Sequence, residues 1–348
     1  MPHGGVTVLL LLLLLVLCGC GVHGYPEMPC RGPGGAAVDS YVALKAPGGQ
    51  RYVYASVDSP PSALHFQADD LSSQRSAVGA TLQQFLAAKS NSTVGWILYN
   101  DETPGGKTSS SYAHAKGVLV FTQNGGFWLV HSVPKFPDSS TTQYSYPDAQ
   151  SIYGQSFICI TVDLPTVNQI AYQLSIDHPQ IYDNYIPDAI RSRYPNIARV
   201  SDDWTGVTTN VAQLSTVGGR VFTSFAKSKK WGQMLYNSLV STTFRCGLNV
   251  ETWMRPVQSS CCQPTCPYPV TLVSNLRLDS VTYTETQDHS KWAISSGCSS
   301  GSSDIFCVGD INQNDSQENR GGGTLCSHSS AVHNLFSSVI QGLDKCPA

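Results

Sequence analysis

Charged residues are scarce in this sequence: they make up 13% of its 348 residues, and the formal net charge is only −3. Ser, Thr, Gly and Tyr take much of their place, a composition that suits a stable exported protein. No zinc-protease helix motif, phosphate-binding P-loop or dinucleotide-binding fingerprint occurs, so we expect neither a metal ion nor a cofactor. Beyond residues 1–24 no apolar run is long enough to cross a bilayer, so we expect a soluble mature chain with no membrane partner.

The one long apolar run, "VTVLLLLLLLVLCGCG", lies close to the first residue and is followed by small residues. We therefore interpret 1–24 as a secretory signal peptide, with an uncleaved anchor as the alternative. Its removal takes away Cys18 and Cys20 and leaves ten of the twelve cysteines. An even number of cysteines in an exported chain favours disulfides over a thiolate metal site. Glycosylation sequons at Asn91 and Asn314 agree with export.

Histidine makes the charge of the mature chain depend on pH. The sequence has nine histidines, of which His3 and His23 lie in the signal peptide. Protonating the other seven would change the net charge from −3 to +4. The mature chain should therefore attract a polyanionic partner only in an acidic compartment.

Hydrophobic periodicity predicts strands and helices in both halves of the chain. The expected strands cover 51–57, 117–121, 126–133, 156–164 and 218–228, and the expected helices cover 76–90, the second part of 227–240, and 329–343. The turn at 122–126 makes a hairpin of the strands on either side. We expect an α/β or mixed fold made of two similar units, 25–165 and 166–348.

A His-x-Lys pair occurs twice, as "AHAKG" with His114 and Lys116 and as "DHSKW" with His289 and Lys291. On a strand, residues two apart project from the same face, so each imidazole lies beside an ammonium group. Two such pairs facing one phosphodiester would supply a nucleophile, a general acid and two charges on the phosphorus oxygens, in place of a divalent metal ion. The alternative is that both pairs are solvated strand ends.

The segments around the two pairs resemble the diagnostic blocks of the deoxyribonuclease II family. These segments are "HAKGVLVFTQNGGFWLVHSVPKFP" and "DHSKWAI…FCVGDINQN…RGGGTLC", and "GWILYNDE", "YGQSFICI" and "FTSFAKSKKWG" resemble further family segments. The resemblance implies an acid, metal-independent endonuclease, lysosomal or secreted, that leaves 3′-phosphate and 5′-hydroxyl ends. It also implies a phospholipase D-like fold, in which two α/β halves related by a pseudo-twofold axis each contribute one His-x-Lys pair.

The resemblance also implies residue roles. His114, Lys116, His289 and Lys291 match the two catalytic motifs, with His114 the expected nucleophile. The wider superfamily often carries an Asp five residues after each Lys, whereas this sequence has Phe121 and Ser296 there. We expect three further side chains to support the catalytic groups by hydrogen bonding: His131, Asp310 and Asn312.

Cysteine spacing, taken with the resemblance, predicts three disulfides: Cys30–Cys159, Cys307–Cys326 and Cys266–Cys346. The partners of the other four cysteines stay open: Cys246, Cys261, Cys262 and Cys298.

A basic cluster in the second half is a candidate for contact with the DNA backbone. It comprises Lys227, Lys229, Lys230 and Trp231, with Trp231 as a platform for stacking. The alternative is an ordinary solvated face.

From the two His-x-Lys pairs and the family resemblance we predict a nuclease acting on DNA, for which a monomer suffices. The rival functions are a phospholipase D-like phosphodiesterase acting on lipid or another substrate, and a nucleic-acid-binding protein without catalysis.

Overall fold

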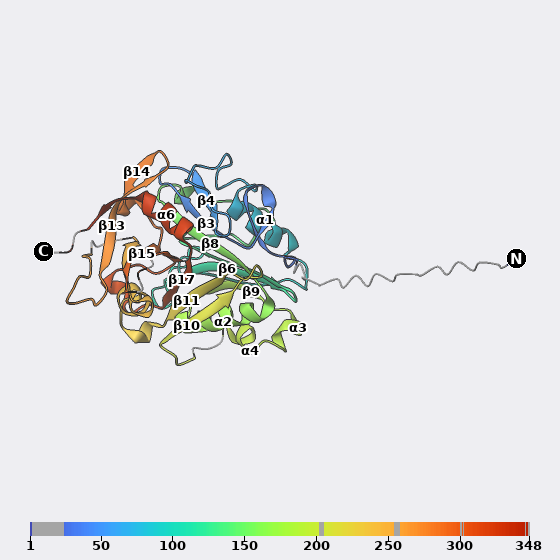
Figure 1. Cartoon of the computed structure of the whole chain (residues 1–348). Helices are drawn as coiled ribbons and strands as arrows, with labels where there is room; N and C mark the ends of the chain where they lie inside the picture. The colour runs from blue at the N-terminus through green and yellow to red at the C-terminus, as the bar shows by residue number, and fades with distance from the viewer. Residues whose placement is uncertain are drawn as a thin grey trace.

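The computed structural model describes Met1 and residues 24–201, 205–253, 258–299, 301, 303–344 and 346. Most of the predicted signal peptide lies outside these described residues. Two large sheets lie alongside each other, the first coloured blue to green and the second yellow to red in Figure 1. Together with six α-helices among the described residues they form a mixed α/β structure, which confirms the predicted fold class.

The first sheet has seven strands, and every neighbouring pair is antiparallel. In spatial order these are β4 (Tyr52–Ser56), β3 (Ser40–Lys45), β8 (Gln155–Val162), β7 (Gly125–His131), β6 (Lys116–Thr122), β5 (Gly95–Asn100) and β9 (Ile181–Tyr185). The hairpin of β6 and β7 is the one predicted from the turn at 122–126. Because β9 pairs with β5, the first sheet extends past residue 165.

The second sheet has nine strands. In spatial order they are β10 (Thr209–Ser215), β11 (Val221–Lys227), β17 (Gly322–His328), β16 (Ile305–Gly309), β15 (Trp292–Cys298), β12 (Cys246–Glu251), β13 (Val270–Leu278) and β14 (Val281–Thr284), with β18 (Ile340–Leu343) also paired to β13. Only β12 and β13 run parallel. A small ribbon of β1 (Cys30–Arg31) and β2 (Ala37–Val38) stands apart.

Helices cover both faces of the sheets. One shared core lies between the sheets and includes the apolar faces of α2 (Leu164–Asp177) and α6 (Ser330–Val339). The outer face of the first sheet packs against α1 (Ala77–Ala88), and that of the second against a π-helical turn, Tyr236–Val240, that continues into α5 (Ser241–Phe244). The short α3 (Asp188–Arg191) and α4 (Pro195–Arg199) follow β9.

The two sheets repeat one arrangement. The order β3-β8-β7-β6-β5 in the first matches β11-β17-β16-β15-β12 in the second, and a core helix follows β8 and β17 alike. Lys45 faces Gln155 across β3 and β8, and Lys227 faces Gly322 across β11 and β17. These registers make residues 153–155 equivalent to 320–322.

The final helix is shorter than predicted. Its apolar stripe suggested a helix over 329–343, but α6 ends at Val339 and Ile340–Leu343 forms β18. The unpaired edge of β13 explains the difference, since Ile340 pairs with Leu276 there and Leu343 with Val273. No helix in the described part of the chain is long and apolar enough to cross a membrane.

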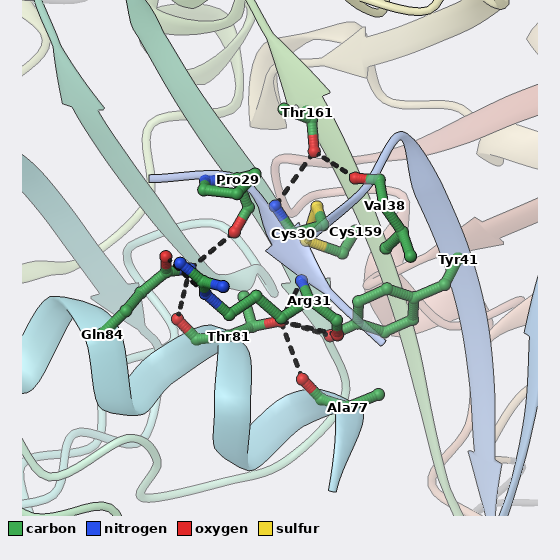
Figure 2. The surroundings of a disulfide bond; sticks show 10 residues. All are labelled: Pro29, Cys30, Arg31, Val38, Tyr41, Ala77, Thr81, Gln84, Cys159 and Thr161. Carbon is green, nitrogen blue, oxygen red and sulfur yellow. Dashed lines mark hydrogen bonds between the residues drawn. A yellow bond between two sulfur atoms is a disulfide. The ribbon is translucent and has the colours of Figure 1, made fainter. Parts of the chain in front are cut away.

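Five disulfides link the described cysteines, and two of the three predicted pairings are present, Cys30–Cys159 and Cys307–Cys326. Figure 2 shows Cys30–Cys159 tying the β1 ribbon to β8, where the Cys30 amide donates to Thr161 Oγ1 at 2.9 Å.

The predicted pairing of Cys346 with Cys266 is wrong. Cys346 bonds to Cys262, and Cys266 closes a five-residue step with Cys261. The last pair, Cys246–Cys298, joins β12 and β15.

Candidate active site

The two His-x-Lys pairs stand at equivalent places, just before or at the first residue of β6 and of β15. Their lysines, Lys116 and Lys291, are both 2% exposed. Burial first, and then the charge of Lys116, lowers the pKa of Lys291 to about 7. Lys291 in turn helps to lower the pKa of His114. The fold therefore brings together two pairs that lie 175 residues apart in the sequence.

His114 is oriented by the second half of the chain. Its amide donates to Gly321 O at 2.9 Å, and its Nδ1 lies 2.6 Å from Asp310 O. Because a carbonyl oxygen only accepts hydrogen bonds, Nδ1 carries the proton and the neutral ring has its lone pair on Nε2. Burial, followed by the charge of Lys116, holds the pKa of His114 well below its ordinary value, despite the opposing effect of Asp101. Both effects favour the neutral form of this imidazole.

Asp101, which the sequence analysis did not identify, is the acid at this site. It follows β5, next to Asn100, which pairs with Lys116. Its Oδ1 accepts from Lys116 Nζ, and its Oδ2 lies 3.0 Å from an Arg320 nitrogen and 3.9 Å from His114 Nε2. Burial alone would raise the pKa of Asp101, but the neighbouring Lys116, His114 and Arg320 hold it well below its usual range.

Arg320 is likewise a site residue that the pattern search missed. Besides binding Asp101, the same Arg320 nitrogen lies 3.2 Å from Ala113 O and 3.2 Å from Tyr112 O. The acid of this site comes from the neighbouring strand, not from position 121 on the motif's own strand, where Phe121 lies in the core. The spacing of residues along β6 alone could not have identified Asp101, because Asp101 follows β5.

His289 is oriented by the first half of the chain. Its amide donates to Gly154 O at 2.9 Å, the equivalent of the His114 bond to Gly321. Its ring stacks on Tyr153, with centroids 4.3 Å apart and planes 4° apart, and meets Trp253 edge-on at 4.1 Å. Lys291 donates from Nζ to His289 O at 2.5 Å. Each half therefore provides the backbone acceptor for the amide of the His-x-Lys histidine of the other.

The surroundings of the two histidines differ at equivalent positions. Lys116 faces Asn100, and the register of β12 with β15 sets Lys291 opposite residue 252, so Asp101 and Trp253 occupy matching places. Arg320 and Tyr153 also occupy equivalent positions, because Arg320 lies two residues before β17 and Tyr153 lies two residues before β8. His114 therefore has an ionic environment and His289 an aromatic one, although the fold around them is repeated.

Two buried lysines anchor the loops that hold these groups. Lys227 Nζ donates to Gln317 O, Glu318 O and Arg320 O at 2.9, 3.0 and 2.5 Å. Its counterpart Lys45 donates to Ala46 O, Gly49 O and Ser151 O at 2.9, 2.7 and 3.0 Å. Burial lowers the pKa of Lys227 to about 8 and that of Lys45 to about 7.

The predicted DNA contact of Lys227 is therefore wrong, because its side chain is fully buried and its ammonium group is saturated by backbone carbonyls. Lys229 and Lys230 are exposed in a 3₁₀ turn, Lys229–Trp231, and Trp231 is partly exposed. Contact of these three residues with DNA stays a prediction.

The three predicted supporting residues take different roles. Asp310 supports His114 through its backbone carbonyl, while its carboxylate accepts from Gly323 N at 3.0 Å. The register of β6 with β7 puts His131 opposite Lys116, fully buried, with Nδ1 accepting from Val133 N at 3.2 Å. Burial lowers the pKa of His131 to about 3, so the ring is neutral. Asn312 Oδ1 is buried with no partner among the described atoms.

The two sequons differ in accessibility. Asn91 is exposed, and glycosylation there stays a prediction. Asn314 is 3% exposed, and its Oδ1 accepts from Ser316 N at 3.0 Å. A glycan at Asn314 conflicts with this burial, because its attachment atom belongs to a side chain enclosed by the fold. Across the described ranges, no three His, Cys, Asp or Glu side chains gather as a metal site would need.

Comparison with known proteins places the chain in one family over nearly its whole length. The family described as Deoxyribonuclease II matches residues 29–346. Porcine (Sus scrofa) deoxyribonuclease-2-alpha is 31% identical over 343 residues, covering 92% of this chain and 91% of that protein. Mouse (Mus musculus) deoxyribonuclease-2-beta is 32% identical (92% and 93% covered), and plancitoxin-1 from Acanthaster planci is 33% identical (86% and 83% covered). The chain therefore belongs to the deoxyribonuclease II family.

Proposed function

We propose that this protein is an acid endodeoxyribonuclease that hydrolyses DNA, without a metal ion, to 3′-phosphate and 5′-hydroxyl ends. Membership of the family, whose relatives include proteins named deoxyribonuclease-2-alpha and -beta, supports DNA as the substrate. The family is also consistent with a phospholipase D-like fold, and the repeated strand order agrees with it. The predicted signal peptide and the expected acid chemistry support a lysosomal or secreted enzyme.

The nucleophile in this proposal is Nε2 of His114. The bond from Nδ1–H to Asp310 O leaves a lone pair on Nε2, and the lowered pKa of His114 favours this neutral form. This bond is the single observation that carries the assignment. Nε2 attacks phosphorus, a P–N bond forms, and the bond from phosphorus to the 5′-oxygen breaks.

His289 is the general acid in this proposal. It gives its proton to the departing 5′-oxygen, so the first product leaves as a neutral hydroxyl. It then takes a proton from water, which attacks phosphorus, breaks the P–N bond and releases the 3′-phosphate. Stacking on Tyr153 and the contact with Trp253 hold the ring in position through both steps.

Lys116, Lys291 and Arg320 supply the positive charge. Lys116 and Lys291 are buried, so their interaction with the phosphate oxygens is weakly screened by water. A phosphodiester anion that enters the site relieves the repulsion between these cations. The negative charge on the phosphorus oxygens then increases in the transition state, so the cations stabilise the transition state more than the bound substrate. One histidine must be neutral and the other protonated, so we expect a bell-shaped pH profile with an acidic optimum.

The test is plasmid nicking between pH 4 and pH 8 in excess chelator, followed by rapid-quench trapping of the protein. We expect activity in acid that persists in chelator, and a phosphorylated peptide containing His114. An enzyme that loses activity in chelator and recovers with magnesium would overturn the mechanism. Tight DNA binding without any cleavage would favour the binding-protein function, and cleavage of a phospholipid but not of DNA would favour the lipid phosphodiesterase.

A further inference from the structure

A small cavity lies beside the backbone of the segment that leads to His114. Its lining contains none of the side chains assigned to catalysis. Its volume is about 240 Å³, below the range of about 300–1,000 Å³ typical of pockets for drug-sized ligands. Its walls come from four separate segments: Ser111 and Ala113, Asp177 and His178, Lys229 and Lys230, and Gly321.

The cavity is joined to the active site through the backbone. Ala113, in its wall, directly precedes His114 and donates from its amide to His178 O at 3.0 Å. Gly321, also in its wall, accepts the His114 amide. No side chain fits at position 321, where a Cβ would lie 1.9 Å from Asp177 O. A ligand in the cavity would therefore border the backbone that carries His114.

The charged groups of the cavity suit an anion. Lys229 and Lys230 are exposed, and the Lys229 ammonium group makes a long hydrogen bond of 3.4 Å to Ser111 O. The carboxyl group of Asp177 is buried and accepts the Lys227 amide at 3.1 Å. Burial, and then the neighbouring Asp310, raises the pKa of Asp177 well above its ordinary value. Both effects favour the neutral carboxyl group, which does not oppose an anion.

Aromatic rings accompany these charges. The His178 ring lines the cavity and lies 5.2 Å, centroid to centroid, from the ring of Tyr112. Tyr112 is 37% exposed, one of the most exposed aromatic side chains in the described structure. Cationic side chains beside exposed rings are the combination with which proteins bind a nucleic acid strand, through its phosphates and bases respectively.

We propose that this cavity binds the nucleotide adjacent to the scissile phosphodiester, with the phosphate between Lys229 and Lys230 and the base against the Tyr112–His178 pair. The proposal rests on the proposed nuclease function and adds a subsite to it. A DNA strand carries one phosphate per about 3.4 Å of helix axis, so the phosphate next to the reacting one must lie a short distance from His114.

The test compares two substrates that differ in whether they can reach the cavity. The first is the nitrophenyl ester of a single nucleoside 3′-phosphate, which has no neighbouring nucleotide. The second is a single-stranded oligonucleotide. In the double variant Lys229→Gln/Lys230→Gln we expect kcat/KM to fall at least ten-fold more on the oligonucleotide than on the ester, mainly through KM. The slope of log KM against log salt concentration should decrease by about 0.7, the value for one phosphate of a single strand.

Arg245→Gln is the matched control. Arg245 is exposed and precedes Cys246, at the opposite end of the β12–β15 ladder from Glu251 and Trp292. The substitution removes one positive charge at a site outside the cavity, and should leave the ratio of kcat/KM on the two substrates unchanged. For the stacking part of the proposal, Tyr112→Ala should lower the ratio about ten-fold and Tyr112→Phe should restore it.

Equal losses on both substrates, or an equal change in Arg245→Gln, would overturn the subsite. A wild-type enzyme that cleaves neither substrate would instead refute the proposed function, so the two failures are distinguishable.

Discussion

Replacing Asp101 by asparagine removes the only carboxylate that binds Lys116 and Arg320 at this site in the described structure. Asparagine has nearly the same shape and keeps one carbonyl oxygen, but it loses the charge. Both cations then remain in a buried site without a counter-ion. Removing one partner of a buried ion pair costs about 3–5 kcal/mol. Because the amide oxygen can still accept one hydrogen bond, we expect a loss of about 3 kcal/mol in the free energy of unfolding.

The pH dependence of this loss follows from the depressed pKa of Asp101. A carboxyl group whose pKa is lowered by folding stabilises the protein fully above its unfolded pKa, about 3.9, and loses this effect as the pH falls through its folded pKa. The difference between the wild type and Asp101→Asn should therefore be the same at pH 5 and pH 7. It should shrink only below about pH 4.

Guanidinium denaturation at the two pH values measures the stability, and single-turnover cleavage of an oligonucleotide measures the activity. Misplacing a reacting group by about 1 Å costs about 100-fold in rate, and we expect a loss of this size because His114 Nε2 lies beside Asp101. The control is Asp58→Asn, which removes the half-exposed partner of Arg220 and should cost less than about 1 kcal/mol. If Asp101→Asn matched Asp58→Asn in stability and turned over like the wild type, the electrostatic reasoning would be wrong.

Three further predictions follow from the site. With a nitrophenolate leaving group, His289→Ala should still form the phosphoenzyme and accumulate it, whereas His114→Ala should form no adduct; a phosphohistidine at position 289 in the wild type would reverse this assignment. Lys227→Met should displace the loop that carries Arg320 and Gly321, and so block adduct formation at His114. Lys45→Met should displace Tyr153 and Gly154, and mainly slow the hydrolysis of the adduct. If rapid-quench assays showed the same defect in both variants, the two lysines would not anchor the two histidines separately. The pKa of Asp310 is raised to about 7, chiefly by burial, so this group should make the wild type lose stability as the pH rises from about 4 to about 7, and Asp310→Asn should reduce the slope. Thermal midpoints across this pH range provide the check, and an unchanged slope in the variant would show that another group is responsible.

Much of the fold could be predicted because its signals are local. The buried strands β6, β7 and β8 contain nearly continuous apolar residues, and Ser76 caps the start of the helix α1 by accepting from Gly79 N at 2.9 Å. The last helix was overextended because its apolar stripe continues into Ile340, where pairing with β13 replaces helical hydrogen bonds. The periodicity of one segment does not show that a neighbouring strand has an unpaired edge.

The sequence alone determined the family resemblance and the two His-x-Lys pairs, because those residues lie next to each other in the chain. It could not show Asp101, Arg320 or Trp253, which come from other strands and loops and reach the site only through strand register and packing. The same holds for Lys227, whose charge suggested a surface but whose place at the end of β11 encloses it among three carbonyls. Only the tertiary structure decided that His114 has ionic neighbours and His289 aromatic ones, because the two environments occupy equivalent positions of a repeated arrangement and are filled by residues far apart in the sequence.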